Sequence, residues 1–311
     1  MWSKTPSGSF DRSTLRFAFS RCSTCRSPLR SNPFRMASPP ERIGLIAGTG
    51  SLAVEFASRA RKRGFDVAAV ALSPDIHGSL KDLVRTIVHA APTQPKKILS
   101  FLQSEGIRRI GFVGKVDKKI LFQGLKFDFE AVRFMFRTKN LADVTIMDAV
   151  IALAEKNGFE IIPQTEFLDH LLAPEGPMGK RRLTAAEIEE VRYGFAMARE
   201  IARLDIGQTI VVKKGAVVAV EAIEGTDETI RRGCALAGAG AIVLKVARPD
   251  QNTRYDIPAV GPETLRVAAE GGASALVVEA GTTFMLEREA LVRAAVAANI
   301  ALIGWTGGEG K

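Results

Sequence analysis

Short runs of strand-forming residues alternate with amphipathic helical patterns from Ile43 onward, and no other feature limits the fold as much. Parallel neighbouring strands need a helical crossover between them, so this order predicts βαβ units and a parallel sheet. The sequence therefore predicts an α/β protein. The elements predicted in the first half are strands at 42–48, 65–72, 107–114 and one starting at 159, with helices at 51–64, 95–106 and 144–158.

The same alternation resumes in the second half after a break. The segment APEGPMGK (173–180) contains two prolines and two glycines, which makes it the best candidate for a domain boundary. The elements predicted beyond it are helices at 184–204, 227–237, 262–271 and 287–298, with strands at 208–212, 216–223, 241–247, 275–280 and 300–305. The first two of these strands are joined by a link of hairpin length. We therefore expect a tail at 1–40, an N-terminal domain at 41–172 and a C-terminal domain at 173–311.

Positive charge is concentrated in the N-terminal tail. The chain has 43 basic and 34 acidic residues, and residues 1–36 hold seven of the basic residues but only one of the acidic residues. The nearly balanced remainder argues against a nucleic-acid partner, which usually leaves a strong basic footprint. The tail is rich in Ser and Arg, as organellar transit peptides are, although an extension upstream of a true start at Met36 is the other interpretation.

Two glycine-containing turns are candidates for phosphate binding. The segment GTGSLA places Gly48, Gly50 and Ala53 in the G-x-G-x-x-A pattern between a predicted strand and a predicted helix. Backbone N–H groups at such a turn can bind a diphosphate, but glycines also serve there simply for close packing. Lys115 follows the strand at 107–114 and can meet a phosphate as a point charge, whereas a solvated charge run is the alternative.

Acidic and basic residues gather at one strand-to-helix junction, VEAIEGTDETIRR (220–232). A helix start needs only one capping side chain, for which Thr226 or Asp227 would serve. Capping does not explain Glu221 and Glu224, which together with Asp227 match the oxygen ligands that Mg²⁺ prefers. Arg231, one turn further on, suits phosphate oxygens. The residues alone leave a metal or phosphate site and a structural cap as equal alternatives.

A polar loop follows the next predicted strand. The segment KVARPDQNTRYDIPAVG (245–261) carries Lys245, Gln251, Arg254 and Asp256. Basic groups beside an acid and an amide match an anionic ligand that bears hydroxyl groups, such as a nucleotide sugar. Surface loops are usually polar even where they bind nothing, so this loop alone does not distinguish a ligand site from an ordinary surface loop.

Side chains that several hydrolase classes need are missing from the sequence. His77, His89 and His170 do not lie in the D-x-H or G-N-H-[DE] settings of calcineurin-like dimetal phosphoesterases. The sequence contains no G-x-S-x-G motif, and Cys234 has no histidine near it in the sequence. Nucleophilic triads are therefore not expected.

Four segments, taken together, resemble one known family. GLIAGTGSLA, LDIGQTIVVKKGAVVAVEAIEGTDETIRR, VLKVARPDQNTRYDIPAVGPET and VVEAG occur in this order and resemble the LpxI-type UDP-2,3-diacylglucosamine pyrophosphatases of lipid A biosynthesis. The resemblance covers about residues 41–306. Its most specific stretches are Asp205–Gln208 and Glu224–Asp227.

The resemblance implies an activity and a set of site residues. The implied reaction is Mg²⁺-dependent hydrolysis of UDP-2,3-diacylglucosamine to UMP and 2,3-diacylglucosamine 1-phosphate (lipid X), by a Rossmann-like N-terminal domain and a C-terminal α/β catalytic domain. The family's essential aspartate matches Asp227, which we expect to be catalytic and to hold Mg²⁺ with Glu221 and Glu224. The residues expected to bind substrate are Gly48, Gly50, Lys115, Gln208, Thr226, Arg231, Lys245, Gln251, Arg254 and Asp256.

Two other functions compete with this one. An NAD(P)-dependent oxidoreductase would use the turn at Gly48 and Gly50, but the acid expected after the second strand is displaced to Asp75. A non-catalytic nucleotide-sugar or lipid-binding protein would use the same groups without turnover. For the hydrolase we expect a cytoplasmic protein, a possible homodimer, that contacts the inner membrane peripherally because its substrate carries two acyl chains. No apolar run approaches the ~18 residues of a membrane span.

Overall fold

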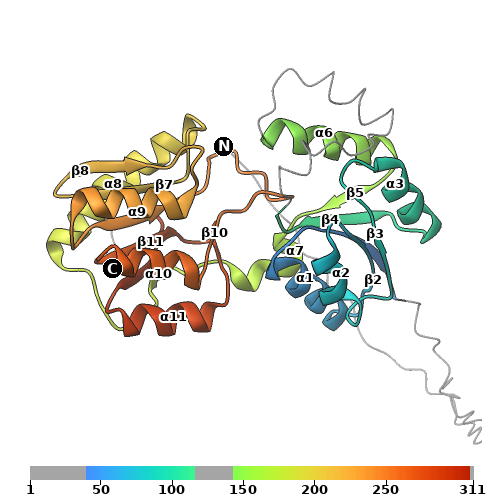
Figure 1. The fold of residues 1–311 in the computed structure, drawn as a ribbon, viewed down its shortest axis with the longest axis horizontal. Coiled ribbons are helices and arrows are strands. Elements are labelled where there is room, and N and C mark those ends of the chain that lie inside the picture. The colour runs from blue at the N-terminus through green and yellow to red at the C-terminus, as the bar shows by residue number, and fades with distance from the viewer. Residues whose placement is uncertain (1–39, 116–142, 309–311) are drawn as a thin grey trace, which may run out of the picture. The chain divides into compact units, whose positions relative to one another are not determined.

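A computed structural model of the chain describes residues 40–115 and 143–308. The tail predicted at 1–40 lies outside the described residues except for its last residue. Among the residues described, no helix combines the length and the apolar composition that crossing a membrane requires. Two α/β domains follow one another along the chain, each around its own sheet (Figure 1).

The N-terminal domain has a five-stranded parallel sheet in the order β3-β2-β1-β4-β5. Its elements are β1 (Arg42–Ala47), α1 (Ser51–Lys62), β2 (Asp66–Ala71), α2 (Pro74–Leu80), β3 (Thr86–His89), α3 (Pro95–Ser104), β4 (Arg109–Val113), α6 (Asp143–Lys156), β5 (Glu160–Ile162), α7 (Thr165–Leu168) and a short 3-10 helix (Asp169–Leu171). The predicted parallel α/β arrangement is confirmed.

Alternating strand residues of this sheet enter two separate cores. Ile43 and Leu45 pack in one cluster with Phe56 of α1, whereas Ile46 packs in another with Leu102 of α3. Helices therefore cover both faces of the sheet, as buried parallel strands require. Figure 1 shows α1 and α3 beside the strands that they cover.

The C-terminal domain has a six-stranded mixed sheet in the order β6-β13-β11-β9-β7-β8 and a two-stranded sheet of β10 and β12. Its elements are β6 (Gly176–Pro177), α8 (Ala185–Arg203), β7 (Thr209–Lys213), β8 (Ala216–Val220), α9 (Thr226–Ala237), β9 (Ile242–Lys245), β10 (Ala259–Val260), α10 (Pro262–Glu270), β11 (Ala275–Glu279), β12 (Phe284–Met285), α11 (Arg288–Ala297) and β13 (Ala301–Trp305). The predicted hairpin is β7 and β8, which pair antiparallel.

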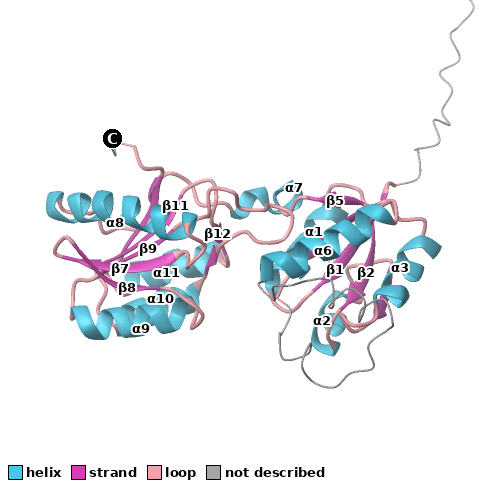
Figure 2. Ribbon diagram, turned by 90° about the horizontal axis from the view of Figure 1, so that it is seen from above, coloured by secondary structure: helices cyan, strands magenta, loops and turns pink. Residues whose placement is uncertain are grey.

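Helix α8 lies on one face of this sheet, and α9, α10 and α11 lie on the other (Figure 2). Most strand residues are hydrophobic because helices cover both faces of the sheet, so Ile210 and Val211 of β7 enter different cores. This packing holds α9 directly against β7 and β8, where the candidate site begins.

The structure differs from the sequence prediction mainly in its short elements. The prediction has no helix corresponding to α2 and no strand corresponding to β3, in which Thr86, Ile87 and Val88 are partly buried and His89 is exposed. It also omits β6, β10 and β12, which have two residues each and cannot show a hydrophobic period. The run predicted as a strand from 159 continues as helix α7 after only three strand residues.

Candidate functional site

Three strand ends meet at one edge of the C-terminal sheet. Thr209, at the start of β7, pairs with Lys245, at the end of β9. The backbone N–H of Glu221, just after β8, donates a 2.8 Å hydrogen bond to the carbonyl of Thr209. Helix α9 begins five residues beyond Glu221. The sheet thus brings together residues that lie up to 36 positions apart in the sequence.

Helix α9 begins without a capping side chain. Its N-cap is Gly225, which has a φ of 85° and a ψ of 173°, and no side chain in the described part of the chain caps it. This backbone conformation is open essentially only to glycine. The alternative that Thr226 or Asp227 serves as the N-cap is therefore wrong, because both lie inside the first turn.

A pocket of about 380 Å³ opens at this helix start. The residues that line it are Lys115, Glu224, Gly225, Thr226, Asp227, Glu228, Arg231, Ala259 and Thr264. Five of them are predicted site residues. The other four lining residues were not predicted: Gly225, Glu228, Ala259 and Thr264. Glu228 directly follows the predicted residue Asp227, and Thr264 lies in the first turn of α10. The only signal for these residues in the sequence is their position beside predicted segments.

The acids of the pocket differ in what they bind. Glu224 accepts hydrogen bonds from the Ala222 backbone and from Arg232. Hydrogen bonding by its own backbone N–H, by Arg232 and by Ala222 lowers the pKa of Glu224. Glu228 pairs with Arg231. Among the described residues, Asp227 has neither a hydrogen-bond nor an ion-pair partner for its carboxylate, which makes it the acid available for a ligand.

Lys245 and Glu221 lie behind Thr226 rather than in the wall of the pocket. The ammonium of Lys245 donates to the Thr226 hydroxyl at 2.7 Å and to the Thr209 hydroxyl at 3.2 Å, and lies 3.9 Å from a Glu221 carboxylate oxygen. Burial lowers the pKa of Lys245, while the charges of Glu221 and Asp227 oppose that shift. The Lys245 side chain is 7% exposed and that of Glu221 is 13% exposed.

The predicted residues of the 245–261 loop form a network of their own. The Gln208 amide donates to Gln251 at 2.8 Å, and Gln251 donates to the Asp256 carboxylate at 2.9 Å. Arg248 bridges Asp256 and Asp205. The network holds the loop in shape next to the sheet edge, but none of its members lines the pocket.

Arg254 and Tyr255 bind residues of α6. Arg254 forms an ion pair with Glu155 at 3.0 Å. The Tyr255 hydroxyl donates to Asp148 at 2.9 Å. Burial and the hydrogen bond to Asp148 raise the pKa of Tyr255 to about 12. Arg254 is therefore a predicted substrate-binding residue that the structure does not bring into the pocket.

The turn at Gly48 has a packing explanation. A Cβ at Gly48 would lie 2.4 Å from the carbonyl oxygen of Lys115, and the two segments exchange backbone hydrogen bonds between Thr49 and Lys115. Gly48 thus permits two loops to touch, whereas Gly50 at the start of α1 faces open space. Asp75 lies in the first turn of α2 rather than at the end of β2, where a ribose-binding acid belongs.

The residues fit Mg²⁺ in one particular way. In the described ranges, no group of three or more His, Cys, Asp or Glu side chains is arranged to hold a metal ion. Glu221 and Glu224 are already engaged, which leaves Asp227. Mg²⁺ is commonly bound by one or two carboxylates together with substrate phosphates and water. The pocket suits that mode rather than a metal site built from protein ligands alone.

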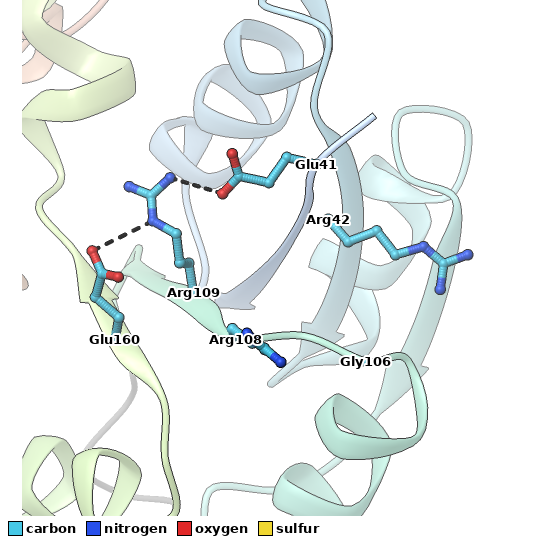
Figure 3. A pocket seen from close by; sticks show the side chains of 6 residues that line it. All are labelled: Glu41, Arg42, Gly106, Arg108, Arg109 and Glu160. Carbon is cyan, nitrogen blue, oxygen red and sulfur yellow. Dashed lines mark hydrogen bonds and ion pairs between the residues drawn. The ribbon is translucent and has the colours of Figure 1, made fainter. Parts of the chain in front are cut away.

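A second pocket, of about 280 Å³, lies at the edge of the N-terminal sheet where its strands begin (Figure 3). Figure 3 shows Arg109 between Glu41 and Glu160, and it pairs with both, as well as with Glu166. The ion pairs neutralise its charge. Open α/β sheets bind ligands at the carboxyl ends of their strands, so this edge is a poor candidate for the site.

Comparison with known proteins gives one family for residues 42–171 and 174–303. Residues 42–171 match the LpxI N-terminal domain, and residues 174–303 match the LpxI C-terminal domain. The chain is 33% identical over 265 residues to the UDP-2,3-diacylglucosamine pyrophosphatase LpxI of Caulobacter vibrioides, covering 82% of this chain and 94% of that protein.

Among solved structures, the biotin carboxylase subunit of pyruvate carboxylase has a weak similarity, with 14% identity and a TM-score of 0.23 over 63% of this chain and 41% of that one. That similarity is too low to bear on fold or function. The two domain matches and the curated relative agree with each other and with the motifs at the pocket. The chain belongs to the LpxI family.

Proposed function

We propose that this protein hydrolyses the diphosphate bond of UDP-2,3-diacylglucosamine, with Mg²⁺, to UMP and 2,3-diacylglucosamine 1-phosphate in lipid A biosynthesis. Membership of the LpxI family and the activity named for the Caulobacter relative support the substrate and the reaction. The pocket at the start of α9 supports the place where the reaction occurs.

The observation that carries the proposal is the carboxylate of Asp227, which has no partner within residues 40–115 and 143–308. It lines the pocket within the first turn of an uncapped helix, while the neighbouring acids Glu224 and Glu228 are paired with arginines. Keeping a carboxylate unpaired in a pocket yields no stability. Such a group is available to ligate a cation or to take a proton from water.

The rest of the pocket suits a diphosphate. The first N–H groups of α9 and its helix dipole favour an anion at this end. Lys115 and Arg231 add positive charge at the same wall. Asp227 itself repels phosphate oxygens, so an anionic substrate and this carboxylate share the pocket favourably only with a cation between them. That repulsion is the physical argument for Mg²⁺.

In the proposed reaction, a water oxygen forms a bond to one phosphorus of the diphosphate, and the bond from that phosphorus to the bridging oxygen breaks. The two products each carry a phosphate monoester, and the two protons of the water pass to the products or to solvent. Bound Mg²⁺ would neutralise charge that develops on the phosphate oxygens. In this proposal Asp227 would ligate the ion or accept a proton from the water, and Lys115 and Arg231 would orient the phosphates.

The test is UMP release from purified protein and UDP-2,3-diacylglucosamine, with Mg²⁺ and with chelator. We expect stoichiometric UMP and 2,3-diacylglucosamine 1-phosphate that disappear on chelation and return with added Mg²⁺. Unchanged turnover in chelator would remove the metal from the proposal. Intact substrate bound without products after long incubation with Mg²⁺ would instead identify a non-catalytic binding protein.

We also propose a peripheral contact with the inner-membrane surface and a cytoplasmic location. The support is the diacylated substrate and the exposure of Ile223, which is 101% exposed next to Glu224, and of Leu204 and Ile206 at 59% and 50%. The backbone of Gly207 lies against that of Glu221, so the two segments that carry these aliphatic residues meet here. Vesicle flotation of Ile223→Ser should show weaker binding than wild type; equal binding would contradict the contact at this place.

A further inference from the structure

Helix α9 is fastened to the sheet through the side chain of its first residue. Because Gly225 has no side chain, the N-cap position itself contributes no such link. The Thr226 hydroxyl accepts a 2.7 Å hydrogen bond from Lys245 and donates a 2.9 Å hydrogen bond to Glu221. The same hydroxyl therefore links an ammonium on β9 with a carboxylate that follows β8.

Lys245 is enclosed at this point. It is the last residue of β9 and 6% exposed, and its ammonium has Thr209, Thr226 and Glu221 around it. An ammonium has three protons to donate, and these oxygens account for its near surroundings. A buried charge is tolerated only when it is paired and hydrogen-bonded. Glu221 supplies that opposite charge.

Glu221 is committed in the same way. One carboxylate oxygen accepts from the Thr226 hydroxyl, and the other accepts from the Gln208 backbone N–H at 3.3 Å and lies 3.9 Å from the Lys245 ammonium. Both oxygens thus have protein partners. Glu221 is also absent from the pocket wall that Asp227 helps to form.

We propose that Lys245, Thr226 and Glu221 are positioning residues. Glu221 is the counter-charge of Lys245 rather than a Mg²⁺ ligand, and the Thr226 hydroxyl connects this ion pair to α9. The group holds the first turn of α9 on the sheet edge and so sets where the Asp227 carboxylate stands. Lys245 supports the pocket from behind and does not bind the diphosphate directly. The effect on catalysis rests on the proposed function, whereas the charge pairing does not.

The charge pairing is tested by a double-mutant cycle of Glu221→Gln, Lys245→Met and the two together. Thermal unfolding is measured in chelator, so that no metal contributes. Each single change leaves one buried charge without its partner and should lower the melting temperature by roughly 6–20 °C. The double variant should melt well above either single variant. Additive losses would overturn the pairing.

The catalytic consequence is read from kcat and KM separately. Each single variant should lose about 10- to 100-fold in kcat, as expected when a reacting group is displaced by roughly 1 Å, with a smaller change in KM. The Mg²⁺ concentration for half-maximal activity should stay near that of wild type. If Glu221→Gln raises this concentration steeply and Lys245→Met does not rescue it, Glu221 is a metal ligand and the proposal is wrong.

Thr226 provides a test that does not alter any charge. Thr226→Ser keeps the hydroxyl and should keep most of kcat, whereas Thr226→Val keeps the shape, loses both hydrogen bonds and should lower kcat as the Glu221 variant does. Equal kcat in the serine and valine variants would contradict the positioning role. These variants remain informative if Lys245→Met does not fold.

Glu187 offers a matched control. It forms a part-buried ion pair with Arg181 in the same domain, at 2.7 Å, and its side chain is 15% exposed. Glu187→Gln should lower stability, leave kcat per folded molecule unchanged and show no coupling to Lys245→Met. If wild-type protein releases no UMP, the proposed function fails, while the melting cycle still decides whether Glu221 and Lys245 are paired.

Discussion

Two helices of the C-terminal domain begin in opposite ways. At α8, Thr184 accepts a hydrogen bond from the Glu187 backbone, and the Glu187 carboxylate accepts one from the Thr184 backbone, which forms a complete capping box. At α9, the N-cap is Gly225, and the following acid, Asp227, has no partner among the residues described. One start is closed by its own side chains, and the other is open to a ligand.

The electrostatics follow the same contrast. Burial acts to raise the pKa of Glu187, but hydrogen bonds from Arg181 and Thr184 outweigh it and bring the pKa to about 2. The Glu187 carboxylate at α8 therefore stabilises the fold and is not available to a ligand. At α9 the helix dipole and the Lys115 ammonium are left for an incoming anion. An unsatisfied helix start, rather than the presence of acids, distinguishes the functional junction from the structural one.

The largest expected effect is at Asp227. Asp227→Ala and Asp227→Asn should each reduce UMP release per folded molecule by a factor of roughly 10² or more, because acid–base groups alone are typically worth 10²–10⁴. Melting temperature should hardly change, since Asp227 caps nothing. The measurement is turnover beside thermal unfolding. A fully active asparagine variant would show that the open helix start is not catalytic.

A smaller effect is expected where the open start is built. Gly225→Ala places a Cβ on a backbone with a φ of 85°. It should cost about 1–3 kcal/mol in unfolding free energy, the range for a residue forced into a glycine-only conformation. Turnover should fall as well, because the first turn carries Asp227. Urea denaturation measures the unfolding free energy, and UMP release measures turnover. A stable, fully active variant would contradict the requirement for glycine.

The corresponding change at the closed start should affect stability alone. Thr184→Ala removes the α8 cap and should cost about 0.5–2 kcal/mol in unfolding free energy. The rate per folded molecule should stay at the wild-type level. Urea denaturation followed by UMP assays at matched folded fractions checks both. A large loss of rate would mean that α8 and α9 are not independent in function.

The smallest effect is an acid dependence of stability. The pKa of Glu187 in the folded protein, about 2, is below the ordinary value of 4.5, so its stabilising contribution is present above pH 4.5 and is lost as the pH falls toward 2. Glu187→Gln should therefore flatten part of the stability loss between pH 4.5 and 2. Melting temperatures of both proteins across that range provide the measurement. Parallel curves would show that Glu187 does not titrate in this way.

Much of the fold was predictable from local pattern. The helices at α1, α3, α8 and α9 are 10 to 19 residues long and show the helical period, so each was placed within a few residues of its bounds. Strands such as β9 and β13 were recognised by apolar runs but drawn too long. Strand β3 was missed because its four residues, three partly buried and one exposed, follow a region without clear alternation.

The candidate site was predictable only in part. The junction at 221–232 was found because its charges exceed what a helix start needs, and the pocket forms there. The sequence could not show that the Gln251 and Asp256 side chains bind one another, or that Arg254 pairs with Glu155. Loop conformation decides such partners, and a polar loop sequence is compatible with many of them.

The sequence by itself determined the α/β class of the fold and the accumulation of acids between β8 and α9, because both depend on neighbours along the chain. Tertiary structure decided which of those acids has no partner among the described residues. Lys245 lies 24 residues beyond Glu221 and reaches it only because β9 and β8 both flank β7, and no side chain within residues 40–115 and 143–308 caps the helix start at Gly225. Charge pairing falls off within a few ångströms, so it follows the folded geometry and not the order of residues.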